Sequence, residues 1–303
     1  MVDHDYVLFA RIVAAGSLSA AGRELHLSPA MVSKRLSRLE QRLGARLVHR
    51  TTRRLALTEA GRAFHEDVVA ILSAAEEAEA RVAGLADIPR GALRMSAPTS
   101  FGRMHIAPCL KGFLDVFPNV TIDLDLSDGF TDLIASRVDL AVRITGAIDP
   151  GHVSHRLAGN MRVLCASPAY LEANGTPASI DALAGHRLLA ATHQSPWRLE
   201  RKGKQIVVPF ESPLRTNSSE VIRELAIAGY GIALRSTWDV GTDLRAGTLV
   251  RLLPEWEGAT DVAIFAVHPR TALVPANVQA MVNHLRGVYE PIPPWESGDL
   301  AQS

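Results

Sequence analysis

The sequence predicts a multidomain α/β chain, in which a small helical domain with one hairpin precedes a larger domain of alternating strands and helices. Three features support this prediction. Two short capped helices are expected within residues 17–43, and apolar side chains repeat every three or four residues from Phe64 to Leu85. From Ala92 onward, short β-like runs alternate with helices, a pattern typical of a sheet covered by helices.

The two short helices are expected to begin at serines. Ser17 and Ser28 each precede an amphipathic run, where a hydroxyl can accept from a backbone N–H that has no partner within the helix. Pro29 suits a first helical position. The inward faces are expected from Leu18, Ala21 and Leu25 in the first helix and from Val32, Leu36, Leu39 and Leu43 in the second. The two helices should share one small core.

The outward face of the second helix combines small and basic side chains, namely Ala30, Ser33, Lys34, Ser37 and Arg38. Small residues allow a helix to enter a major groove, where hydroxyl and basic groups reach base edges and phosphates. A hairpin is expected over residues 46–57, and its turn carries Arg50, Thr51, Thr52, Arg53 and Arg54. Such a turn can follow a phosphate backbone. Double-stranded DNA is therefore the expected partner, and an ordinary solvated helix face is the alternative.

The charge distribution agrees with this expectation. The whole chain has 32 basic and 32 acidic residues. Residues 1–62 hold 11 lysines and arginines against five acids, a net charge of +6, so the remainder carries −6. A basic N-terminal part on an acidic body favours an oriented, salt-sensitive attraction to DNA.

A long helix is expected after residue 58. Its apolar positions are Phe64, Val68, Ile71, Ala75, Ala78, Val82 and Leu85. This 3.5-residue repeat predicts one strand of a two-stranded coiled coil and hence a homodimer, which would read a palindromic site. The alternative is a helix packed on its own domain. Pro89 and Gly91 mark the domain boundary.

The C-terminal region is expected to form an α/β sheet structure. Strands are predicted at residues 93–97, 121–126, 139–144, 162–166, 188–191 and 263–267, and helices at 101–117, 130–136, 218–228 and 275–287. Ligands bind such sheets beyond the carboxyl ends of strands, near helix N-termini that favour anions.

Polar loops in both halves of this region predict a cleft for an anion or small molecule. Thr99 and Ser100 precede one helix, Thr216 to Ser218 precede another, and Arg143 ends a strand. The segment from Ser195 to Trp197 is expected to supply an apolar wall. The alternative for each hydroxyl is a simple helix cap, and for Trp197 a place in the core.

No catalytic or metal-binding motif is found, so the expectation is no enzyme activity, no metal and no cofactor. His152 and His155 lie in an expected loop with no evident third ligand. Cys109 and Cys165 are expected to be buried thiols rather than a disulfide. With neither a membrane-spanning tract nor a secretion signal in the sequence, the expected location is the cytoplasm.

With these residues in view, the chain resembles the LysR-type transcriptional regulators over essentially its full length. The resemblance lies in residues 9–16, 18–25, 28–43, 44–53 and 57–61 and the long helix that follows. It implies a winged helix-turn-helix (residues 1–58), a dimerising linker helix (59–88) and an effector-binding domain (92–290). That domain would have two lobes like a periplasmic binding protein, lobe I at 92–161 and 268–290 and lobe II at 162–267. Residues 291–303 are expected to form a flexible tail.

The resemblance also implies functional residues. The candidate DNA-binding residues are Ser28, Pro29, Ala30, Ser33, Lys34, Arg38, Arg50, Thr52, Arg53 and Arg54. The candidate effector-binding residues are Thr99, Ser100, Phe101, Arg143, Ser195, Trp197, Thr216, Asn217 and Ser218. Many members carry Gln at the position of Pro29, so their operator preference does not transfer to this chain.

The implied partners are promoter DNA, further copies of the chain in a homodimer or homotetramer, and RNA polymerase. The effector would be a small metabolite, carboxylated or aromatic. Two other functions are weighed against regulation: a cytoplasmic small-molecule binding protein without promoter-specific DNA binding, and an enzyme that uses the cleft. The lack of an export signal and of a catalytic constellation disfavours them.

Overall fold

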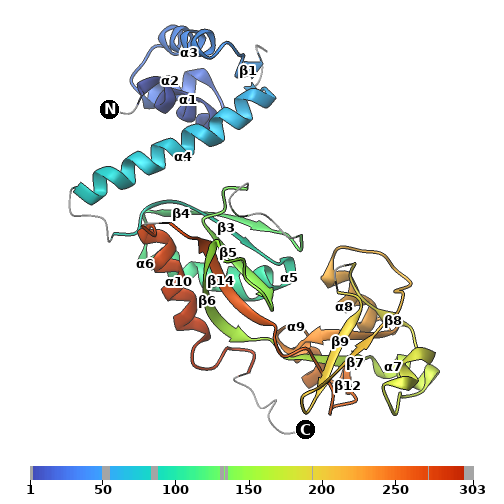
Figure 1. The fold of residues 1–303 in the computed structure, drawn as a ribbon. Coiled ribbons are helices and arrows are strands. Elements are labelled where there is room, and N and C mark those ends of the chain that lie inside the picture. Colours follow the sequence, from blue (N-terminus) through green and yellow to red (C-terminus); the bar gives the residue numbers. More distant parts are fainter. Residues whose placement is uncertain are drawn as a thin grey trace. The chain divides into compact units, whose positions relative to one another are not determined.

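The computed structural model describes residues 3–49, 55–82, 88–129, 133, 136–192, 194–271 and 273–296. The chain forms two compact units, residues 1–88 and 89–303 (Figure 1). Each unit has its own hydrophobic core.

The first unit contains three short helices, a two-stranded hairpin and a long helix. They are α1 (His4–Ala15), α2 (Leu18–Glu24), α3 (Pro29–Leu43), β1 (Val48–His49), β2 (Ala56–Leu57) and α4 (Glu59–Val82). The expected caps are confirmed, because Ser17 Oγ accepts from Ala20 N at 3.1 Å and Ser28 Oγ accepts from Met31 N at 3.3 Å. The hairpin is also confirmed, with Val48 opposite Leu57 and His49 opposite Ala56.

The first part of α4 packs on its own unit. Val68 is fully buried, and the Phe64 ring lies 5.3 Å from Tyr6 and 5.5 Å from Phe9 between ring centres. Two residues assigned to the coiled-coil repeat are thus used inside the unit, which corrects that part of the expectation. The correction has a physical cause: α1 presents aromatic side chains that compete for the same stripe of α4. Further along the repeat, Ile71 is 47% exposed, and Leu85 lies outside the described residues.

The second unit contains a five-stranded sheet in the order β4-β3-β5-β14-β6. Its strands are β3 (Gly91–Ala97), β4 (Val120–Leu126), β5 (Leu140–Thr145), β6 (His152–Gly159) and β14 (Ala263–Pro269). Strand β3 is parallel to β4 and β5, while β14 is antiparallel to β5 and β6. Helices α5 (Thr99–Phe101), α6 (Ala107–Val116) and α10 (Ala276–Tyr289) contribute to its core, and a π-helical turn, Gly102–Ile106, joins α5 to α6. We call this part lobe I.

The other part of the unit, lobe II, contains two smaller sheets in the orders β12-β7-β11-β8 and β10-β9-β13. The strands are β7 (Arg162–Ala166), β8 (Leu188–Leu189), β9 (Trp197–Arg201), β10 (Lys204–Val208), β11 (Ile232–Ser236), β12 (Val250–Leu252) and β13 (Glu257–Gly258). The helices are α7 (Pro168–Asn174), a 3₁₀ turn at Asp181–Gly185, α8 (Ser219–Ile227) and α9 (Thr237–Ala246). Apolar side chains of β7 and β11 pack on both faces of the four-stranded sheet.

The structure differs from the expected borders in two places. Strand β14 belongs to lobe I, not lobe II, because its backbone pairs with β5 and β6. The segment around His152 and His155 is strand β6 rather than a loop, and His155 Nε2 lies 3.2 Å from His268 Nε2 of β14. The expected helix at 130–136 falls mostly outside the described residues.

The start of the expected tail is packed. Trp295 is 7% exposed, and its ring lies 4.7 Å from His105 and 5.8 Å from Phe101. Burial of this large aromatic ring outweighs the prolines and polar residues that suggested a loose end. The flexible-tail expectation is therefore wrong for residues 291–296, while 297–303 lie outside the described part.

Within the described residues, no helix has the length and apolar character needed to cross a membrane. The same part of the chain contains no cluster of three or more metal-ligating side chains. The Cys165 thiol is buried, Cys109 is half-buried, and neither forms a disulfide.

Candidate functional site

The N-terminal end of α3 presents an open surface. Ser28, Pro29, Ala30, Ser33 and Lys34 are all exposed, while Val32, Leu36 and Leu39 on the opposite face are buried. The helix therefore keeps its small and basic side chains in solvent. A helix end of this kind can approach a groove closely.

Arg38 is exposed as well, but it has a partner in the protein. Its guanidinium donates to Asp5 Oδ2 at 2.9 Å, and Arg35 Nε lies 3.2 Å from Asp5 Oδ1. Asp5 is buried in α1. The hydrogen bond to this carboxylate raises the pKa of Arg38. Asp5 thus fixes α3 on α1 and sets the direction in which Arg38 points.

A second buried carboxylate connects α3 to the β1–β2 hairpin. Glu40 Oε1 accepts from Leu47 N at 2.9 Å and from Val48 N at 3.3 Å, and Glu40 Oε2 lies 3.2 Å from Arg46. Helix α3 and the hairpin are held together by these bonds. The hairpin-tip residues Arg50, Thr52, Arg53 and Arg54, predicted to contact DNA, lie outside the described residues.

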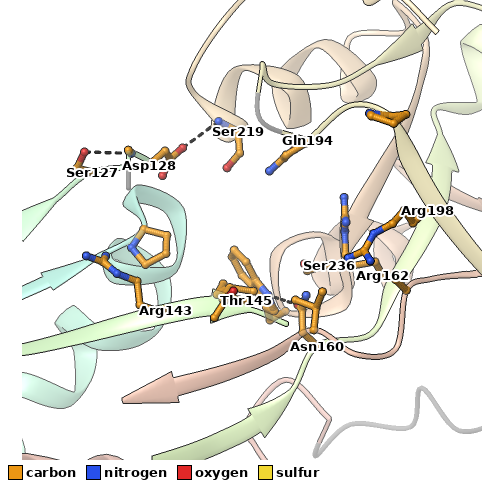
Figure 2. A pocket seen from close by; sticks show the side chains of 17 residues that line it. Ser127, Asp128, Arg143, Thr145, Asn160, Arg162, Gln194, Arg198, Ser219 and Ser236 are labelled. Carbon is orange, nitrogen blue, oxygen red and sulfur yellow. Dashed lines mark hydrogen bonds between the residues drawn. The ribbon is translucent and has the colours of Figure 1, made fainter. Parts of the chain in front are cut away.

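The second unit contains a cavity of about 440 Å³ between lobes I and II. Figure 2 shows its polar side chains converging from both lobes. Lobe I contributes Pro98, Ser127, Asp128, Gly129, Arg143, Ile144, Thr145 and Val262, and lobe II contributes Arg162, Gln194, Pro196, Arg198, Ser219, Ser236, Trp238 and Ala259. Asn160 lies between β6 and β7 and accepts from Trp238 Nε1 at 2.9 Å. The size suits a small molecule.

Of the nine candidate effector residues, Arg143 is the one that lines this cavity. Phe101 is fully buried in the lobe I core, and Trp197 is 1% exposed in the lobe II core against Phe210. Trp197 is therefore not an apolar wall of the cleft. It lies on the inward side of β9, where alternate residues point to opposite faces.

Two of the remaining candidates have hydroxyls bonded to the local backbone. Ser195 Oγ donates to the carbonyl of Phe210 at 3.3 Å, and Thr216 Oγ1 accepts from Ser218 N at 3.1 Å. Asn217 is exposed and Ser100 is buried, and neither lines the cavity. The capping alternative is not confirmed for these hydroxyls: α5 and α8 begin without a side-chain cap bond, and among the described residues Ser100 Oγ has no hydrogen-bond partner.

The helix N-termini expected to bind an anion already hold a carboxylate of the protein. Asp128, in the loop after β4, accepts from Thr99 N at 2.7 Å and from Ser219 N at 3.0 Å. Thr99 begins α5 in lobe I, and Ser219 begins α8 in lobe II. Asp128 therefore bridges the two lobes (Figure 2) and occupies donors that the sequence assigned to a ligand.

The positive charge of the cavity comes mainly from residues that the sequence analysis missed. Arg162 and Arg198 lie beside one another on the lobe II side (Figure 2). Burial, together with nearby Arg235 and Arg198, lowers the pKa of Arg162 to about 10. Burial also lowers the pKa of Arg143, although Asp125 opposes the shift. The sequence signal that could have identified Arg162 is its position as a basic residue at the start of an apolar strand, directly before Val163.

The Asp128 bridge leads to a testable prediction. We expect Asp128→Asn to lower the free energy of unfolding of the second unit by about 1–2 kcal/mol, because a neutral amide loses the charge-assisted bonds to two helix N-termini. Urea unfolding followed by tryptophan fluorescence measures this change, since all four tryptophans lie in that unit. Asp123→Asn, at an exposed position of β4, is the matched control. Equal stability of the two variants would contradict the bridge.

Comparison with known proteins places both units in one family of regulators. Residues 4–62 match the model described as bacterial regulatory helix-turn-helix protein, lysR family, and residues 86–290 match the LysR substrate binding domain. The HTH-type transcriptional regulator DmlR of Escherichia coli K12 is 33% identical over 287 residues, covering 93% of each chain. The HTH-type transcriptional activator TtdR of E. coli UTI89 is 35% identical over 268 residues, covering 87% of this chain and 86% of that protein.

Solved structures show the same architecture. CrgA, a LysR-type transcriptional regulator from Neisseria meningitidis, gives a TM-score of 0.59 at 29% identity and covers 95% of this chain and 98% of its own. The full-length structure of AphB, a virulence activator of Vibrio cholerae and a member of the LTTR protein family, gives a TM-score of 0.60 at 25% identity. That match covers 95% of this chain and 99% of AphB.

Proposed function

We propose that this chain, which belongs to the LysR family of bacterial transcriptional regulators, changes how it binds promoter DNA when a small-molecule effector binds between lobes I and II. The cavity of about 440 Å³, lined by polar side chains of both lobes, carries this proposal. A molecule bound there contacts both lobes at once. It therefore shifts the equilibrium toward the arrangement of the two lobes that it binds more tightly.

The proposed DNA surface is the exposed start of α3 together with the hairpin. Ala30, Ser33 and Lys34 reach base edges, and Ser28 and the arginines of the hairpin tip reach phosphates. Pro29 has no side-chain donor, so it contributes shape rather than a base-specific hydrogen bond. The bonds of Glu40 to Leu47 and Val48 support this model, because they fix the hairpin at a set position relative to α3.

The proposed assembly is a homodimer through the later part of α4, and two such dimers in a tetramer. Support comes from Ile71, which is 47% exposed on the helix after its first turns are packed internally. Two DNA-binding units related by a two-fold axis would read a palindromic operator. A regulator of promoters acts where the chromosome lies, so the proposed location is the cytoplasm. RNA polymerase is the proposed partner for activation at the promoter.

Gel-shift and footprinting assays on the DNA immediately upstream of the chain's own gene test this function. We expect a footprint of two half-sites spaced by whole helical turns. The double variant Arg50→Ala/Arg53→Ala should weaken binding broadly across sequences and reduce the salt slope by about 2, since each phosphate contact contributes about 1. Arg11→Ala, an exposed position on α1, is the control and should keep the wild-type slope.

The absence of a footprint at low salt, with and without small organic acids, would refute promoter binding. An unchanged salt slope in the double variant would instead remove the hairpin tip from the DNA surface and leave α3 as the main contact.

A further inference from the structure

The lobe II wall of the cavity carries two arginines, and one of them, Arg162, is not paired with a carboxylate among the described residues. Arg162 donates to the carbonyl of Leu234 at 3.4 Å, and among the described residues it forms no ion pair with a carboxylate. Its neighbour Arg198 has one such pair, to Asp261 at 3.4 Å, and both members of that pair are half-exposed. An exposed pair of this kind contributes little stabilisation.

The other acidic groups nearby are already engaged. Asp239 is bound by Arg235, and both side chains are almost fully buried. Asp128 lines the cavity, but its two oxygens accept from Thr99 N and Ser219 N. A guanidinium in a partly desolvated wall without a carboxylate partner is costly unless a ligand supplies the opposite charge.

The polar groups around Arg162 suit an oxygen-rich molecule. Gln194 and Ser236 add an amide and a hydroxyl to the lining of the same cavity, and Trp238 provides an apolar ring. Thr145 lines it as well, with its hydroxyl bonded to the backbone of Ala147. The Trp238 ring is fixed, because its Nε1 donates to Asn160 Oδ1. A planar guanidinium pairs with a carboxylate through two parallel hydrogen bonds, a geometry that a lysine cannot provide.

We infer that the effector is a small organic acid whose carboxylate is bound by Arg162, with Arg198 as the second cation. This inference rests on the proposed function only in taking the cavity as the effector site. Binding of the acid would relieve the mutual repulsion of Arg162, Arg198 and Arg235. The same anion would also repel the Asp128 carboxylate, which lines the same cavity, so that ligand binding and the bridge between lobes become linked.

The test uses the full chain in a low-chloride buffer with acetate, succinate, benzoate, neutral succinamide and inorganic phosphate, each at roughly 20 mM, high enough to populate a weak site. Thermal unfolding is followed by tryptophan fluorescence, which reports on the second unit alone. At least one carboxylate should raise the midpoint by roughly 2 °C or more, as expected when a ligand binds the folded state selectively. Succinamide should have no effect.

Three variants locate the site. Arg162→Gln should weaken binding of the active acid roughly 10- to 100-fold in calorimetry, because a charged hydrogen-bonding partner is lost. Arg162→Lys keeps the charge and should retain part of the affinity. Arg245→Gln, an exposed arginine on α9 outside the cavity lining, should bind as the wild type does. Circular dichroism confirms that each variant is folded.

The outcomes separate this inference from the proposed function. No shift with any carboxylate, or equal affinity in Arg162→Gln and wild type, overturns the inference even where promoter binding is intact. A response to phosphate that equals the response to the acids shows a general anion site and also overturns it. Acid binding without any DNA footprint supports the inference and refutes the proposed function.

Discussion

Gly61→Ala should unfold the DNA-binding unit at temperatures where the second unit stays native. A Cβ at Gly61 would lie 1.9 Å from the carbonyl oxygen of Leu47 and 2.8 Å from its carbonyl carbon. That carbonyl accepts from Thr58 N at 3.0 Å, and the Leu47 side chain is buried, so the backbone has no room to yield. We expect a loss of about 3 kcal/mol, the upper range for an overpacked core.

The sign of this effect is informative, because alanine normally stabilises a helix relative to glycine by about 1 kcal/mol. Gly287→Ala is the control: it lies within α10 with no atom within 4 Å of the added Cβ, and it should stabilise the second unit. DNA affinity reports on the first unit and tryptophan fluorescence on the second, while circular dichroism follows both, so a circular dichroism transition without a fluorescence change belongs to the first unit. A Gly61→Ala protein with normal DNA affinity and an unchanged circular dichroism transition would show that the contact relaxes easily.

Asp239→Ala should destabilise the second unit by about 3–5 kcal/mol, the usual cost of leaving one member of a buried ion pair without its partner. Arg235 is 4% exposed and donates to Asp239 Oδ2 through both Nε, at 2.7 Å, and an η nitrogen. The loss is increased by Arg162 on the adjacent strand, which lies close enough to repel Arg235. The change is measured by urea unfolding with tryptophan fluorescence.

Two comparisons test this interpretation. The double variant Arg235→Met/Asp239→Leu should be more stable than Asp239→Ala, because it removes the buried Arg235 charge that the single variant leaves without its partner. Asp115→Ala removes a pair with Lys111 in which both side chains are largely exposed, and it should change stability by less than about 1 kcal/mol. A double variant as unstable as the single one would mean that packing, rather than charge, dominates this site.

The elements that depend on local sequence could be predicted closely. Helix α3 begins at Pro29 after its Ser28 cap and ends at Leu43, the last apolar position expected in it, and Gly44 then adopts the left-handed conformation. Strand β7 covers residues 162–166 as expected. In these elements, the capping residues and the apolar periodicity lie close together in the sequence and favour the same structure.

The β9–β10 hairpin was missed although its signal was present. Trp197 and Leu199 alternate with polar residues, and Lys202 and Gly203 form the turn with positive φ angles of 49° and 79°. Such a pair of angles is typical of a tight hairpin turn. The expectation of an apolar wall groups Trp197 with Ser195 and Pro196 before it and overlooks its alternation with the residues that follow.

The ligand cavity could not be predicted residue by residue. Arg162 and Arg198 are 36 positions apart in the sequence and meet because β7 and β9 belong to two different sheets of lobe II. Asp128 reaches Ser219 from the other lobe, a separation of 91 residues. Contacts of this kind depend on topology, and nothing in the local pattern around each residue specifies its partner.

The position of β14 constrains how the protein is made. This strand lies between β5 and β6 in the lobe I sheet, yet it is synthesised after all of lobe II. At about 5–20 residues per second, the ribosome needs roughly 5–25 s to go from the end of β5 to the start of β14. During that interval one edge of β5 is without its strand partner, and the whole of lobe II is synthesised. Completion of lobe I is thus a late step of biosynthesis, and the nascent chain needs protection from edge-to-edge association until then.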